Sequence, residues 1–335
     1  MGRPKGLREL AAVALSAAIL VWLAVTGEGA TRPGWPQGLS IATAPVGGTY
    51  YVWGAAFAKI LSDKVGIATT VEVTAGPVQN IRLVDAGQSS LAIATNGPVY
   101  EGWRGLDWAK GKQHTNMRVV LPMYASHFHG LVLAKHPIRS IRDLTGHPVG
   151  AGARGGTPDL YFRRVIEILG IKPSRIVNLG FQEMNDQTKD GMIVGYYTAV
   201  GPPQPSFTEL ETTHDVRIVG VLPEDARKVQ EKFPYMLPGT LPAGTYRSQK
   251  EAVPNIVGFN LLIGHKDLPE DLVYALAKAA YDNHDALIAA HPIAKEMPPE
   301  RMAHAPSPIH PGAIRYFREK GVQIPNDLIP PEAKR

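Results

Sequence analysis

The tripeptide Gly-Gly-Thr occurs twice in this chain, each time between an apolar run and a segment with helical spacing. Gly47-Gly48-Thr49 follows the run 39–44, and Gly155-Gly156-Thr157 follows residues 148–152. Glycine lets a ligand approach the backbone, and the N–H groups and dipole of a helix start favour negative charge. Either turn alone fits plain helix capping by its threonine equally well. The pair favours two lobes whose helix ends face one anionic ligand.

One cation lies within the second glycine turn. Arg154 directly precedes Gly155, and a planar guanidinium can bind a carboxylate through two hydrogen bonds. We interpret Arg154 as a partner for a ligand carboxylate, with a solvated loop cation as the alternative. If Arg154 has this role, its replacement by alanine should weaken binding at least tenfold.

Other kinds of chemistry have less support. Gly150, Gly152 and Gly155 have the spacing of a dinucleotide fingerprint, but the next strand ends without the acidic residue that holds a ribose. His127 and His129 share one face of a strand, and no third metal ligand is identifiable. The chain has no Cys and no Gly-x-Ser-x-Gly or His-Glu-x-x-His motif. We therefore predict a binding protein, not an enzyme, with no metal and no cofactor.

Strands and helices alternate along the chain, which predicts an α/β fold with a mostly parallel sheet. The same order of elements occurs in both halves. Two apolar segments, 119–135 and 256–263, are suited to cross between the halves and form a hinge. The expected strands are 39–44, 69–73, 91–94, 148–152, 175–179 and 192–197, and the expected helices are 50–65, 78–85, 158–169, 182–189, 270–291 and 311–320.

The N-terminus resembles an export signal, which predicts a periplasmic location. Arg3, Lys5 and Arg8 precede the apolar stretch 10–25. Glu28 lies at the −3 position of a cut after Ala30, where a small residue is preferred, so an uncleaved membrane anchor stays open. The formal net charge is +5, of which residues 1–38 supply +2, and the remaining cations are dispersed. Nucleic acid is therefore not a predicted partner.

Longer stretches resemble the TAXI-type solute receptors of TRAP (tripartite ATP-independent periplasmic) transporters. Gly47-Gly48-Thr49-Tyr50-Tyr51 is similar to the family's opening motif, and residues 74–83, 241–246, 267–274 and 310–316 are similar to further signatures. The resemblance implies a two-lobed periplasmic-binding-protein fold of type II with two hinge-crossing strands. It also implies that a small organic acid, glutamate-like in typical members, is bound between the lobes and delivered to the TRAP membrane subunits.

The chain departs from the family pattern at the expected site. Pro77 replaces a Ser, and Thr95-Asn96-Gly97 stands where the family has Gln-Ser-Asp. The second glycine turn is one residue shorter and gains Arg154. If the family's Asp receives a ligand ammonium, its absence favours a carboxylate without an amino group.

We divide the chain into a signal peptide or anchor (1–30), a linker (31–38), lobe 1 (39–125), lobe 2 (126–255), and a return crossing strand with C-terminal bracing helices (256–335). Two alternatives remain: a membrane-tethered ligand sensor of the same fold, and an enzyme on a similar two-lobed fold, such as a pyrimidine synthase. The candidate ligand-binding residues are Gly48, Thr49, Tyr50, Tyr51, Pro77, Asn80, Thr95, Asn96, Arg154, Gly155, Gly156 and Thr157.

Overall fold

The computed structural model describes residues 32–334 of the chain. The chain divides into two units, Met1–Gln37 and Gly38–Arg335. In the described part of the first unit, the Arg32 guanidinium lies 4.8 Å from the centroid of the Trp35 ring. The predicted leader, 1–30, lies outside the described residues. The sheet, the helices and the cavity described below all belong to the second unit.

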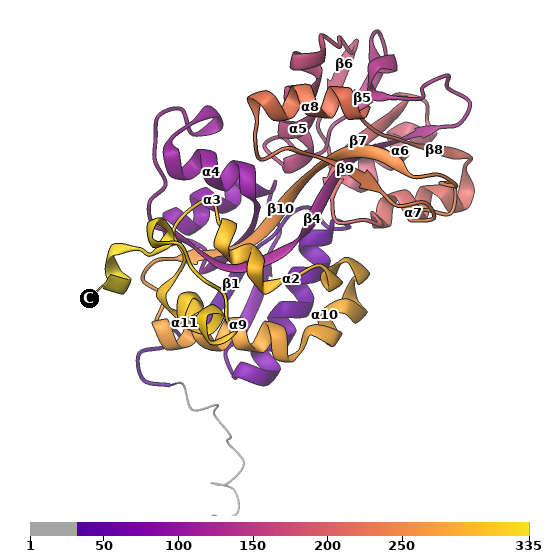
Figure 1. Cartoon of the computed structure of the whole chain (residues 1–335). Helices are drawn as coiled ribbons and strands as arrows, with labels where there is room; N and C mark the ends of the chain where they lie inside the picture. The colour runs from indigo at the N-terminus through magenta and orange to yellow at the C-terminus, as the bar shows by residue number, and fades with distance from the viewer. Residues whose placement is uncertain (1–31, 335) are drawn as a thin grey trace, which may run out of the picture. The chain divides into compact units, whose positions relative to one another are not determined.

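One sheet runs through the second unit (Figure 1). Its order is β2-β1-β3-β10-β4-β7-β5-β6, with β8 paired to β4 and β9 paired to β10. The strands are β1 (Gly38–Ala42), β2 (Ala68–Glu72), β3 (Leu91–Thr95), β4 (Met117–Leu133), β5 (Pro148–Gly150), β6 (Arg175–Val177), β7 (Gly195–Val200), β8 (Val216–Val219), β9 (Leu237–Leu241) and β10 (Val253–His265).

The first lobe is built on the parallel strands β1, β2 and β3. Strand β1 pairs with β2 from Gly38–Ala68 to Ala42–Glu72, and with β3 at Ile41–Leu91 and Ala42–Ala92. A helix follows each strand, so all three helices begin at the carboxyl edge of the sheet, where ligands bind in open α/β folds. These helices are α2 (Thr49–Ile60), α3 (Pro77–Asp85) and α4 (Asn96–Arg104).

Strands β4 and β10 connect the two lobes. They pair antiparallel with each other, from Ile256–Phe128 to His265–Met117. The Asn260–Gly264 part of β10 also pairs with β3 of the first lobe, whereas the His127–Val132 part of β4 pairs with β7 of the second lobe. The two predicted crossing strands are therefore confirmed, and β4 is buried along its whole length.

The second lobe repeats the strand–helix order on β5, β6 and β7. The expected strand 192–197 begins later, at Gly195, because residues 190–193 turn back onto α6: Asp190 N–H donates to Asp186 O and Ile193 N–H to Gln187 O. Large apolar and aromatic side chains such as Phe128, Phe162 and Tyr197 fill its core. The helices of this lobe are α5 (Thr157–Leu169), α6 (Phe181–Lys189), α7 (Pro205–Thr213) and α8 (Pro223–Lys232).

The C-terminal helices are α9 (Glu270–Asp282), α10 (His284–Ala290) and α11 (Pro311–Glu319). The prediction of one helix over 270–291 was wrong, because Asn283 leaves the helical conformation (φ −117°, ψ 28°) and its Nδ2 donates to Ala279 O at 2.9 Å. Helix α11 packs on α9, with the Tyr274 and Tyr316 ring centroids 5.8 Å apart. Both α9 and α10 contact α2, so this segment covers the first lobe.

Candidate functional site

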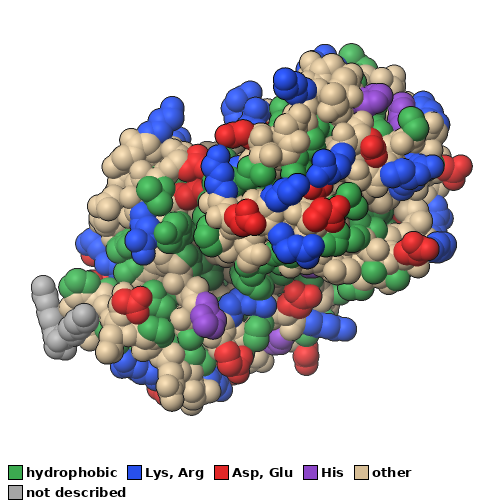
Figure 2. Space-filling view, turned by 45° about the horizontal axis from the view of Figure 1, so that its top comes forward, with side chains coloured by type: hydrophobic (Ala, Val, Ile, Leu, Met, Phe, Trp, Pro, Cys, Tyr) green, Lys and Arg blue, Asp and Glu red, His purple; other side chains and the backbone are tan. Residues whose placement is uncertain are grey.

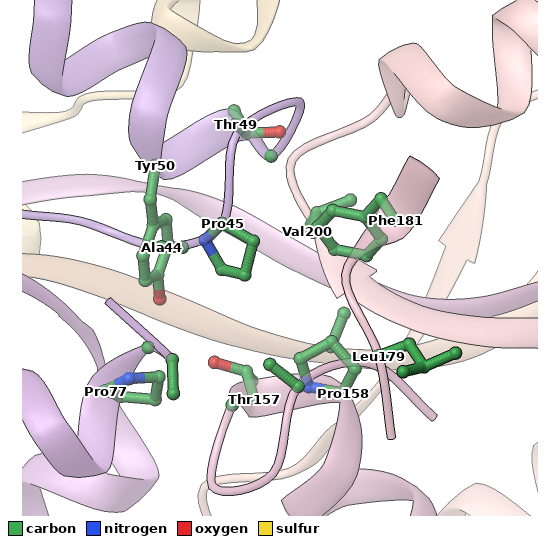
Figure 3. A pocket seen from close by; sticks show the side chains of 16 residues that line it. Ala44, Pro45, Thr49, Tyr50, Pro77, Thr157, Pro158, Leu179, Phe181 and Val200 are labelled. Carbon is green, nitrogen blue, oxygen red and sulfur yellow. The ribbon is translucent and has the colours of Figure 1, made fainter. Parts of the chain in front are cut away.

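A cavity lies between the two glycine turns, where the lobes face each other (Figure 3). The cavity is small: the region in which the centre of a water-sized sphere fits has a volume of about 30 Å³. A solute of more than a few atoms can enter only if the lobes separate. The lining residues are Ala44, Pro45, Gly48, Thr49, Tyr50, Ala75, Gly76, Pro77, Ala153, Gly156, Thr157, Pro158, Leu179, Phe181, Ala199 and Val200.

Four helix N-termini meet at this cavity, two from each lobe. Helices α2, α3, α5 and α6 begin after the N-cap residues Gly48, Gly76, Gly156 and Gly180, and glycine has no side chain that could accept from the first N–H groups of the helix. The N–H groups of a first helical turn have no acceptor within their own helix. Each helix end favours an anion by about 0.3–1 kcal/mol when exposed, and by more when partly buried. The backbone therefore gives the cavity a positive potential.

Thr49 and Thr157 are the first helical residues, so the alternative interpretation, in which each threonine serves as an N-cap, is wrong. The extended residues Gly48 and Gly156 take the cap position, with φ/ψ of −93°/153° and −71°/160°. The threonine hydroxyls are therefore available for contacts between the lobes. Thr49 Oγ1 donates to Gly201 O at 2.8 Å, and the Oγ1 atoms of Thr157 and Thr95 lie 2.7 Å apart.

A hydrogen-bond network continues from these threonines into the hinge. The Tyr50 phenol oxygen lies 2.7 Å from Thr95 Oγ1 and 2.6 Å from Oδ1 of Asn260 on β10. Asn260 Nδ2 donates in turn to the carbonyl oxygen of Tyr124 and to Ser126 Oγ on β4, both at 2.9 Å. Burial raises the pKa of Tyr50 to about 12, against the opposing effect of its hydroxyl neighbours, so the phenol keeps its proton at neutral pH.

No acidic, basic or imidazole side chain belongs to the described lining of the cavity. Arg154 is exposed and lies outside the lining, so the direct carboxylate contact expected for it is not made in this conformation. Gly155 also lies outside, and its N–H donates to Asp159 Oδ2 at 3.0 Å. Over the face in Figure 2, Lys and Arg are interspersed with Asp and Glu.

The cavity brings together six of the predicted ligand residues: Gly48, Thr49, Tyr50, Pro77, Gly156 and Thr157. Thr95 reaches it through the hydroxyls of Tyr50 and Thr157. Tyr51, Asn80 and Asn96 do not line it. Asn80 is fully buried and holds the sheet edge, since its Nδ2 donates to Thr43 O at 2.6 Å and Ile93 O at 2.7 Å. Asn96 Oδ1 accepts from Gly97 N–H at 2.9 Å.

Sequence reasoning missed the apolar side of the cavity. Leu179 and Phe181 follow β6, and Ala199 and Val200 end β7. In Figure 3 the Phe181 and Val200 side chains lie together across the cavity from Tyr50. Their position just after or at the end of a strand was the available signal, because strand ends of an α/β sheet meet at one edge.

The His127–His129 pair lies in the hinge. His129 Nε2 lies 2.7 Å from the Tyr246 hydroxyl, and Nδ1 lies 2.8 Å from His127 O. Burial lowers the pKa of His129 to about 3 and that of His127 to about 4, so both rings are neutral at pH 7. Within residues 32–334, no three His, Cys, Asp or Glu side chains are arranged to share a metal ion.

The comparison with protein families agrees with this architecture. The model of the NMT1-like family matches residues 41–321. The chain belongs to the NMT1-like family. Across the described residues of this NMT1-like protein, no helix has both the length and the apolar character needed to cross a bilayer.

Solved structures of periplasmic binding proteins are similar to this NMT1-like chain. The periplasmic binding protein BugD has a TM-score of 0.53 and 13% identity over 79% of this chain and 87% of BugD. The GluR0 ligand-binding core from Nostoc punctiforme, in complex with L-glutamate, has a TM-score of 0.49 and 15% identity over 76% of this chain and 97% of its own. The periplasmic aliphatic sulphonate binding protein SsuA from Escherichia coli has a TM-score of 0.42 and 13% identity over 85% of this chain and 83% of SsuA. The predicted two-lobed type II fold is confirmed.

Proposed function

We propose that this NMT1-like protein is an extracytoplasmic solute-binding protein that captures a small carboxylate between its lobes and delivers it to a TRAP-type permease. One observation carries the proposal: helix N-termini from both lobes meet at a cavity to which the described residues contribute no charged side chain. An anion there contacts both lobes at once. Its binding energy therefore favours the closed arrangement that a permease recognises.

The lining also disfavours an amino acid as the solute. An ammonium group beside several helix N-termini needs a carboxylate to offset their repulsion, and no Asp or Glu belongs to the described lining. Helix N-termini repel a cation. We therefore assign the cavity to a carboxylate without an amino group.

Binding without turnover has support from the same residues. Nucleophilic or acid–base catalysis needs an activated nucleophile or a titratable group near the substrate. The hydroxyls of Thr49, Tyr50 and Thr157 are held in short hydrogen bonds, and no general base lies within hydrogen-bond reach of them in the described lining.

The TRAP assignment is supported by the motifs at 47–51 and 74–83, because each motif contributes residues to the cavity lining, among them Gly48 and Pro77. The periplasmic location is supported by the leader 1–30 and by the BugD-like fold. A membrane-tethered sensor would share the cavity and keep the leader, and N-terminal sequencing of the mature protein distinguishes the two.

Two measurements test the proposal. Mass spectrometry of small molecules released from freshly purified protein should identify a carboxylic acid. Calorimetry should then show that this acid binds at least a hundredfold more tightly than its neutral primary amide, which has nearly the same shape. Equal affinities for acid and amide would refute the anion site, and conversion of the bound compound would refute pure binding.

A further inference from the structure

The amide of Asn260 has a fixed orientation. Its Nδ2 lies 2.9 Å from the carbonyl oxygen of Tyr124, which carries no proton. Turning the amide over would bring two acceptor oxygens together at this distance. Oδ1 therefore faces Tyr50, at 2.6 Å from the phenol oxygen. Because a carbonyl oxygen only accepts, Tyr50 donates its one proton to Asn260.

This fixed orientation sets the direction of the next two hydrogen bonds. The phenol oxygen of Tyr50 also lies 2.7 Å from Thr95 Oγ1, and its proton is already used, so the Thr95 proton is directed toward Tyr50, with Asn260 Oδ1 as a further acceptor at 3.2 Å. Thr95 Oγ1 lies 2.7 Å from Thr157 Oγ1, and by the same reasoning Thr157 donates to Thr95. Figure 3 shows the Thr157 hydroxyl pointing toward the phenol end of Tyr50. The Thr157 proton is thus directed into the network, and the lone pairs of Thr157 remain for a ligand.

The other lining hydroxyl behaves in the same way. Thr49 Oγ1 lies 2.8 Å from the carbonyl oxygen of Gly201, so Thr49 donates its proton there. Each hydroxyl of the described lining therefore accepts, and the donors left for a ligand are backbone N–H groups at the helix starts. A solute that has only acceptor atoms satisfies the N–H groups and leaves the lone pairs of Thr157 Oγ1 without a donor.

We infer that the solute carries a hydroxyl group beside its carboxylate, so that the cavity takes a small hydroxycarboxylate. This inference rests on the proposed function. The helix N-termini hold the carboxylate, and Thr157 Oγ1 accepts a hydrogen bond from the solute hydroxyl. A deoxy acid lacks this donor, and a keto acid places a second acceptor against the lone pairs of Thr157. Thr157 is therefore the specificity-determining residue, and Thr95 sets its direction.

Calorimetry with two matched sets of acids tests the inference. Lactate, propionate and pyruvate form the three-carbon set, and 2-hydroxybutyrate, butyrate and 2-oxobutyrate form the four-carbon set. We expect each hydroxy acid to bind about tenfold more tightly than the deoxy and keto acids of its set. Equal affinities within both sets would overturn the inference and leave the carboxylate function intact. If no acid of either set binds, this inference fails, whereas the carboxylate proposal is decided by the comparison of the released acid with its amide.

Variants of Thr157 and Thr95 distinguish an effect of hydrogen-bond direction from an effect of side-chain packing. Thr157→Val should abolish the preference, so that the affinities for the hydroxy acid and the deoxy acid of a set become equal within about threefold, whereas Thr157→Ser should keep the preference. Thr95→Val removes the acceptor of the Thr157 proton, which then points to the solute, so the preference should shift toward the keto acid. A merely structural role of Thr95 would weaken all three acids equally, which would contradict the assigned direction. Thermal unfolding of each variant establishes that it is folded.

Discussion

Arg164 and Glu101 belong to different lobes and form a buried ion pair, with Arg164 Nη2 at 2.7 Å and 2.8 Å from the two carboxylate oxygens of Glu101. Their side chains are only 6% and 3% exposed. Asp107 Oδ2 accepts from the same nitrogen at 2.8 Å, and the Tyr235 hydroxyl donates to Glu101. Since α4 and α5 carry the pair, it forms only when the lobes are closed, and it stabilises closure from outside the cavity.

We expect Arg164→Ala to open the lobes. In the closed form the variant would leave the Glu101 carboxylate buried without its cation, which costs about 3–5 kcal/mol. Opening hydrates Glu101, so the radius of gyration from small-angle X-ray scattering should increase. The free energy of unfolding should fall by less than about 3 kcal/mol for the same reason.

The exposed pair Lys59–Asp63 supplies the control for this prediction. Lys59→Ala should change the free energy of unfolding by no more than about 0.5 kcal/mol and leave the radius of gyration unchanged. An Arg164→Ala protein with the scattering curve of the parent would contradict the role of the pair in closure.

Stability should decrease on acidification because of His129. Burial lowers its pKa from 6.5 to about 3 in the folded protein. Between these values the unfolded chain binds more protons, so the stability present above pH 6.5 is lost as the pH falls toward 3. One such group contributes up to about 1.4 kcal/mol per pH unit to the slope of the free energy of unfolding against pH.

Urea denaturation at pH 4.5, 5.5 and 6.5 should therefore show a shallower dependence of the free energy of unfolding on pH for His129→Gln than for the parent. His304→Gln, at an exposed position, should keep the parent slope, and an identical slope for both variants would refute the assignment to His129.

Local patterns predicted most of the elements that alternate regularly, but they missed α4 and α7, whose first residues are typical of turns. Helix α4 starts at Asn96-Gly97-Pro98, and α7 starts at Pro205 after Pro202-Pro203. Such sequences indicate turns, but a first helical turn also tolerates proline. Helix starts and turns use the same residue types, so the residues at these two helix starts do not distinguish a helix from a turn.

The sequence predicted the part of the cavity lining that short local motifs supply. The Gly-Gly-Thr turns carry their own signal, and they supply Gly48, Thr49, Gly156 and Thr157. The position of Val200 depends on the pairing of β7 between β4 and β5, which is a tertiary relationship. The hydrogen-bond direction at Thr157 depends on a contact between Asn260 and Tyr124, which are 136 residues apart. No short pattern encodes such a pairing.

Arg154→Ala distinguishes a direct contact from long-range attraction. Because Arg154 is exposed and outside the lining, we expect its effect on carboxylate affinity to be less than about threefold at 0.15 M salt. The effect should grow at low ionic strength, where screening is weaker. Calorimetry at two salt concentrations measures both. A loss of tenfold or more that is insensitive to salt would instead establish the bidentate contact considered from the sequence.

Gly156→Ala should prevent full closure. A Cβ at Gly156 would lie 2.9 Å from the carbonyl oxygen of Ala75 in the opposite lobe and equally close to Ala153 O in its own turn. The φ of −71° at Gly156 suits alanine, so backbone conformation gives no separate penalty. We expect at least tenfold weaker binding of the best-bound acid, together with a larger radius of gyration.

The matched control lies at the other end of the same helix. Gly170 ends α5 with a φ of 68° and has open space around its Cα, so Gly170→Ala strains the backbone without touching the first lobe. That variant should lose about 1–2 kcal/mol of stability and keep the parent affinity. If Gly156→Ala instead binds as tightly as the parent and scatters identically, the close approach of the two glycine turns is not required for binding. If both variants lose affinity to the same extent, the effect follows from reduced stability and not from blocked closure.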